Sequence, residues 1–143
     1  MHRHLFVKEF GEPTLQVIVL GFLTFGVYYF IWIAERRKKL NEIANKEIFD
    51  KNFLIYAAIC SGLPGIFASL HIRLIMPAIL ILQIAYSAFM IAISWQMGKW
   101  LEEYANTQWG IELRVNTFLL LFFNILYVNY LINKIADMEI KEI

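Results

Sequence analysis

Residues 74–98 read LIMPAILILQIAYSAFMIAISWQMG, a stretch without a single Lys, Arg, Asp or Glu. A helix in the core of a soluble protein needs only one apolar stripe. This stretch is apolar on all sides, over a length near the ~20 residues that cross a bilayer. Three further stretches, 13–34, 52–70 and 116–133, share this property although the chain holds 13 basic and 12 acidic residues. We therefore expect an all-α integral membrane protein with four membrane-embedded helical segments.

The composition agrees with this fold class. The chain is 59% hydrophobic, against roughly 45–50% in ordinary soluble domains. Four segments and their short links use nearly all of the 143 residues, so we expect a single membrane domain over residues 1–143. The net charge of +1 gives no basic surface for nucleic acid. The first residues lack a continuous apolar core, and we expect no removable signal peptide.

Lys and Arg predict the orientation. The link 35–51 carries six of them, whereas the link between the second and third segments carries only Arg73. Because basic residues near membrane segments favour the cytoplasm, we expect the link 35–51 inside and Arg73 outside. The second and third segments then form a spanning hairpin. We expect the exit of the first segment to anchor this topology, with the residues Tyr28, Trp32, Arg36, Arg37, Lys38 and Lys39.

The first and last segments have two possible topologies. If both span, eight basic residues lie inside and five outside; if both are re-entrant, 12 lie inside and one outside. Re-entrant segments are uncommon because lipid offers no hydrogen bonds to exposed backbone. Three similar hexapeptides, 40–45, 101–106 and 132–137, favour exits on one common side, although many amphipathic helix ends read this way. Both topologies stay open from the sequence.

Polar residues within the apolar segments are candidates for helix packing or for a pore lining. Gln83, Ser87 and Ser94 recur on one face of the third segment. In lipid such groups bind neighbouring helices, at roughly 0.6–2 kcal/mol each. No ionisable group lies inside a segment, which argues against proton-coupled transport. The fourth segment contributes Asn124 and Asn129.

No catalytic pattern stands out. His2, His4 and His71 lack the further ligands that a zinc site needs, and the single cysteine, Cys60, reads as a small apolar residue. We expect no cofactor, no metal and no enzymatic activity. We expect an accessory or interaction subunit, partnered by the lipid bilayer and by a second copy or another membrane protein. The alternative is a small homo-oligomeric pore that permeabilises the membrane.

The string TFGVYYFIWIAERRKKLN, residues 24–41, resembles the signature of an uncharacterised family of small bacterial membrane proteins. Its members carry Thr-x-Gly-x-Tyr-x-x-x-Trp before a basic run and Leu-Asn, and YVNYLINKIAD resembles their closing segment. The resemblance implies a bacterial inner membrane and no known activity. A related larger family flanks a similar motif with elements on one side, which favours the re-entrant topology. The matching residues are Thr24, Gly26, Tyr28, Trp32, Arg36–Lys39, Leu40 and Asn41.

Overall fold

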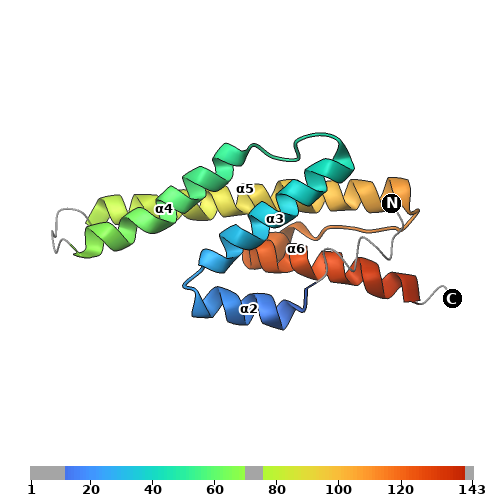
Figure 1. The fold of residues 1–143 in the computed structure, drawn as a ribbon, viewed down its shortest axis with the longest axis horizontal. Coiled ribbons are helices and arrows are strands. Elements are labelled where there is room, and N and C mark those ends of the chain that lie inside the picture. The colour runs from blue at the N-terminus through green and yellow to red at the C-terminus, as the bar shows by residue number, and fades with distance from the viewer. Residues whose placement is uncertain (1–11, 70–75, 141–143) are drawn as a thin grey trace.

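The computed structural model describes residues 12–69 and 76–140, and within these ranges the chain is helical without strands. The all-α prediction is confirmed. The helices pack as a bundle whose α4–α5 pair continues beyond the others at one end (Figure 1). Their bounds are α2 Thr14–Leu23, α3 Val27–Ala44, α4 Lys51–Ser69, α5 Met76–Gln108 and α6 Thr117–Ile140.

The first apolar stretch is a helical hairpin instead of one long helix. Phe25 and Gly26 have φ of 51° and 88° and end α2 after only 10 residues. The turn satisfies its own backbone, because Gly26 N donates to Gly21 O at 2.7 Å and Tyr28 N donates to Thr24 Oγ1 at 2.9 Å. The left-handed conformation suits Gly26 and is uncommon for Phe25.

An ion pair at the open end of this hairpin follows from the reversal of the chain between α2 and α3. Arg36 Nη2 lies 2.8 Å from Glu12 Oε1. One straight helix would place these residues about 36 Å apart. The arms also meet near the turn, where a Cβ on Gly21 would lie 2.3 Å from Tyr29 Cζ. Only glycine permits this close approach.

Helix α5 is the longest element and pairs with α4 along its first half. Its 33 residues rise about 50 Å. Phe89 contacts the rings of Phe53 and Tyr56, with centroids 5.9 and 5.8 Å away. Helix α4 continues through Pro64 without a break.

Helix α6 is sharply bent at Asn124, whose φ of 50° and ψ of −124° are not helical. Asn116 N donates to the Tyr127 hydroxyl at 3.0 Å. A straight helix would separate the two residues by about 16 Å, so the first arm of α6 folds back on the second. Before α6, residues 109–116 run back along α5, so that Val115 lies beside Gly98. A Cβ on Gly98 would lie 2.8 Å from Cδ1 of Leu120 in α6.

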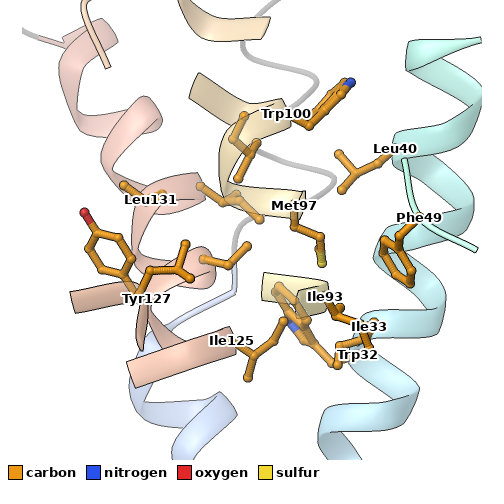
Figure 2. Close-up of a cluster of buried hydrophobic side chains, with 14 of the residues drawn as sticks. Trp32, Ile33, Leu40, Phe49, Ile93, Met97, Trp100, Ile125, Tyr127 and Leu131 are labelled. Carbon is orange, nitrogen blue, oxygen red and sulfur yellow. The ribbon is translucent and has the colours of Figure 1, made fainter. Parts of the chain in front are cut away.

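The hydrophobic core occupies one half of the molecule. Side chains from α3, α5 and α6 point toward one another there (Figure 2). The far half of the α4–α5 pair has no such cover, and Leu80, Ile81 and Ile84 are each more than 60% exposed. The largest core residues include Trp32, Ile33, Leu40, Ile93, Met97, Leu101, Leu131 and Ile132.

Two helices, α5 and α6, are long and apolar enough to cross a membrane, while α2 and α4 are shorter apolar helices. The prediction of four such segments is therefore not supported. The first stretch fails because its turn divides it, and α6 has the length without being straight. The expected residues 13–34, 52–70, 74–98 and 116–133 fall instead on α2 with the start of α3, on α4, on α5 and on α6.

Candidate functional site

Glu12 is the hub of a polar cluster that joins the first and last apolar stretches. Its carboxylate accepts the Tyr28 hydroxyl at 2.7 Å and Arg36 Nη2 at 2.8 Å. Its backbone oxygen accepts the side-chain amides of Asn129 at 3.0 Å and Asn133 at 2.7 Å. We call these five residues the Glu12 cluster. It fastens both hairpins at the same end of the bundle.

Arg36 and Trp32 are structural members of this end of the bundle. Arg36 is only 3% exposed and Trp32 only 1% exposed. The Arg36 guanidinium lies 5.2 Å from the centre of the Trp32 ring, a cation–π distance. A buried charge needs a partner, and Glu12 supplies it. Arg36 Nε, Trp32 Nε1 and Asn129 Oδ1 are buried without a hydrogen-bond partner among the described residues.

The rest of the basic run divides between structural and outward roles. Arg37 Nη2 pairs with Glu47 at 2.6 Å, and Arg37 Nε donates to Phe49 O at 3.0 Å. This arginine therefore closes the loop between α3 and α4. Lys38 is exposed and Lys39 is partly buried. The anchoring role of Arg36–Lys39 stays a prediction, but the side chains of Arg36 and Arg37 are engaged inside the protein.

The three polar residues predicted on one face of α5 differ in their exposure. Gln83 and Ser87 are exposed, and we call this pair the α5 stripe. Ser87 Oγ donates to Gln83 O of its own helix at 3.0 Å. Ser94 is fully buried, and its hydroxyl has no partner among the described residues. The α5 stripe therefore faces outward, whereas Ser94 belongs to the core.

The bend of α6 borders a small cavity beside the α5 stripe. The cavity has a volume of about 210 Å³, and its polar lining consists of Tyr29, Tyr86, Ser87 and Asn124. Asn124 Oδ1 is buried, and no described residue gives it a hydrogen bond. Asn129, one and a half turns later, lies in the Glu12 cluster instead. The two asparagines predicted from α6 thus belong to different polar sites, Asn124 to the cavity and Asn129 to the Glu12 cluster.

Sequence reasoning missed Glu12, Tyr29 and Tyr86. Glu12 lies directly before the first apolar stretch, and Arg36 comes shortly after it. In the structure these two charges meet, because the stretch between them reverses. In a spanning helix they would lie on opposite sides of the membrane. The tyrosines carry no comparable signal.

The chemistry available to the Glu12 cluster and the α5 stripe is hydrogen bonding and ion pairing. Among the described residues, no group of three or more His, Cys, Asp or Glu could hold a metal ion. Cys60 is a free, buried thiol. His2, His4 and His71 lie outside the described residues.

Comparison with known proteins identifies the family of the chain. The chain belongs to the DUF4234 family, described as a domain of unknown function, whose model matches residues 12–132. The match begins at Glu12 and includes both hairpins and the α4–α5 pair. No curated protein and no solved structure matches the chain. The resemblance to an uncharacterised family is confirmed at this level, while the Thr-x-Gly-x-Tyr-x-x-x-Trp signature and the bacterial membrane stay predictions.

Proposed function

We propose that the chain is a non-enzymatic, multi-pass protein of the bacterial inner membrane. In this proposal α4 and α5 span the bilayer, and α2–α3 and α6 enter from the cytoplasmic side and return to it. All four apolar stretches are then embedded, but only two of them cross. The exposed apolar side chains of α2, α4, α5 and α6 support this placement because such an extensive apolar surface is costly in water.

The ion pair between Glu12 and Arg36 supports the re-entrant topology. It brings the two ends of the first stretch to one side, and Asn129 and Asn133 bring the second arm of α6 to that same side. With this topology, 12 of the 13 basic residues lie in the cytoplasm, as the positive-inside rule favours.

We propose that within the membrane the protein is an accessory or interaction subunit. The observation that supports this function is the outward position of the α5 stripe. In hydrocarbon the Gln83 amide would leave its donors and acceptors unpaired, which is unfavourable. A helix from another protomer, or from another membrane protein, would satisfy them. Ile84, Ala88 and Ile91 flank the α5 stripe and give that helix an apolar seat.

The same stripe supports one second candidate, a homo-oligomeric pore. If several copies turn Gln83 and Ser87 toward a common axis, water replaces the partner helix. Ser87 also borders the cavity that contains Tyr29, Tyr86 and Asn124, so the polar surface extends into each protomer. In a packing seam the α5 stripe contacts another helix and excludes water, whereas in a pore it contacts water.

Cysteine cross-linking tests the proposed interface. In a Cys60→Ala background, Gln83→Cys should form a disulfide-linked dimer, or a cross-link to one co-purified membrane protein, in native membranes. The matched control is Ile81→Cys, which is also exposed on α5 but lies about 160° from Gln83 around the helix. Equal cross-linking at both positions, or none at Gln83, would contradict the interaction site.

Conductance separates the two candidates. The pore predicts ion leakage from loaded vesicles, which Gln83→Leu should reduce strongly. The accessory-subunit proposal predicts that vesicles with the wild-type protein and vesicles with Gln83→Leu both retain their ions. It also predicts that Gln83→Leu weakens the binding free energy of the complex by on the order of 1 kcal/mol for each lost hydrogen bond.

A further inference from the structure

We propose that this protein is a one-leaflet wedge, wider in the cytoplasmic leaflet than in the outer one, and that it therefore prefers membrane that is convex on its cytoplasmic face. The occupant of its exposed apolar surface, outside the α5 stripe and the residues that flank it, is lipid acyl chain. The inference rests on the membrane topology proposed above. It adds a shape and a direction of curvature to that topology.

The position of the bilayer along α5 follows from its sequence. The apolar part of this helix runs from Met76 to Gly98 and is followed by Lys99. This part rises about 33 Å, which matches the ~30 Å of a hydrocarbon core. Its middle falls at Tyr86 and Ser87, which mark the midplane.

Both hairpins end at that midplane. Tyr29, one turn after the α2–α3 reversal, and Asn124, at the α6 reversal, line the same cavity as Tyr86 and Ser87. The rings of Phe30 and Tyr86 are 6.1 Å apart. In Figure 1 the α4–α5 pair continues past the α2–α3 turn, so none of the other described helices reaches the outer end of this pair.

The surface of the hairpins suits lipid and not water. Phe25 at the first reversal is 99% exposed and Phe22 is 83% exposed. Phe122 and Phe123, beside the second reversal, are both more than half exposed. The backbone of the first turn is hydrogen-bonded internally, as hydrocarbon requires. The polar Glu12 cluster lies at the opposite, headgroup end of the same hairpins.

The two leaflets therefore hold unequal amounts of protein. The cytoplasmic half contains α5, α2, α3 and the two arms of α6, with only the first turns of α4, whose Phe53 contacts Phe89 just past the midplane; among the described helices the outer half contains α4 and α5. With helix diameters of about 10–12 Å, three extra helices occupy roughly 240–340 Å² of one leaflet only. Such a shape fits best where that leaflet is expanded, which is the convex side of a curved membrane.

Orientation in vesicles of different size tests the wedge. The Cys60→Ala, Glu103→Cys protein would be reconstituted into phosphatidylethanolamine–phosphatidylglycerol vesicles, which are then separated by size. Glu103 lies near the cytoplasmic end of α5. An impermeant thiol reagent therefore labels only molecules whose wide end faces outward. Labelling after detergent gives the total.

We expect the ratio of outward to inward molecules to be at least about 2-fold higher in the small vesicles, equivalent to about 0.4 kcal/mol. Equal ratios in firmly embedded protein would overturn the wedge alone. Extraction of the protein by alkaline carbonate would overturn the membrane proposal itself, and the wedge with it.

Two variants connect the effect to the hairpin. Phe25→Asp places a charge at the midplane and should draw the α2–α3 turn toward the headgroups, which removes most of the size dependence. Gln108→Asp, outside the bilayer, should keep it. If Phe25→Asp does not fold, as judged by circular dichroism, the paired change Phe22→Ala and Phe25→Ala trims the tip without charge and should reduce the dependence. Full size dependence in a folded tip variant would overturn the proposal.

Discussion

Replacing Gly21 by alanine should destabilise the α2–α3 hairpin, although alanine is the better helix former. By intrinsic propensity alone, the change in α2 would stabilise the helix by roughly 0.5–1 kcal/mol. The packing has the opposite effect. A Cβ at this position would lie 2.3 Å from Tyr29 Cζ, 2.4 Å from its Oη and 2.7 Å from its Cε1.

The magnitude follows from what must move. All three atoms belong to one rigid ring, so no single flexible atom can yield, and the whole Tyr29 side chain has to shift. Overpacking of this kind costs typically about 1–3 kcal/mol. After subtraction of the propensity gain, we expect Gly21→Ala to lower the free energy of unfolding by about 1 kcal/mol, and by no more than about 2.5 kcal/mol.

The assay is reversible unfolding in mixed micelles, followed by circular dichroism, with Gly62→Ala in α4 as the matched control. A Cβ on Gly62 meets nothing within 4 Å, so this variant should be neutral or slightly more stable. In the double variant Gly21→Ala, Tyr29→Ala the clash disappears, and its loss of stability should be smaller than the sum of the single losses. If Gly21→Ala stabilises the protein as much as Gly62→Ala, the two arms do not approach as described, and the reasoning is refuted.

Two further changes test other contacts. Glu12→Gln leaves the buried Arg36 without its charge partner and should lower the free energy of unfolding by about 1–3 kcal/mol, since the carboxylate is itself partly exposed. Glu35→Gln, whose exposed carboxylate lies 3.8 Å from the same guanidinium, should change it by less than about 0.5 kcal/mol in the same denaturant titration, and equal effects would argue against the Glu12 cluster. Gly98→Val should displace Leu120 and lower the thermal midpoint by an amount equivalent to about 1–3 kcal/mol, and an unchanged midpoint would mean that α6 does not seat on α5 at Gly98.

The helices of this fold were largely predictable because apolar composition acts locally. The charge-free stretches marked where α4, α5 and α6 lie. The first residues of the three similar hexapeptides, Leu40, Leu101 and Ile132, lie in one buried core, whereas the sequence had suggested only that the three exits share one side of the membrane. The reversals were harder to predict. The first turn has two residues with positive φ, and one of them is Phe25, a residue that rarely adopts this conformation. The second turn depends on Asn124 alone, without glycine or proline.

The candidate site was predictable only in part, since its contacts join distant residues. Asn129 and Ser87 stood out as polar residues in apolar stretches. Glu12 did not, because its partners in the Glu12 cluster lie 16 to 121 positions away in the chain. The burial of Trp32 and Arg36 likewise depends on the reversal of the first stretch. A spanning helix would have left both at the membrane surface, where the sequence had assigned them an anchoring role.

Thiol accessibility at Lys134 tests the central claim, the re-entrant topology, most directly. In the Cys60→Ala background, Lys134→Cys reports the end of the second α6 arm, Glu103→Cys reports the cytoplasmic end of α5, and Met76→Cys reports its outer end. An impermeant thiol reagent is added to intact cells and then to opened ones. The account predicts that Met76→Cys is labelled from outside, whereas Lys134→Cys and Glu103→Cys are labelled only after opening. Labelling of Lys134→Cys from outside, with Glu103→Cys still protected, would mean that the last apolar stretch crosses the membrane and would contradict the account.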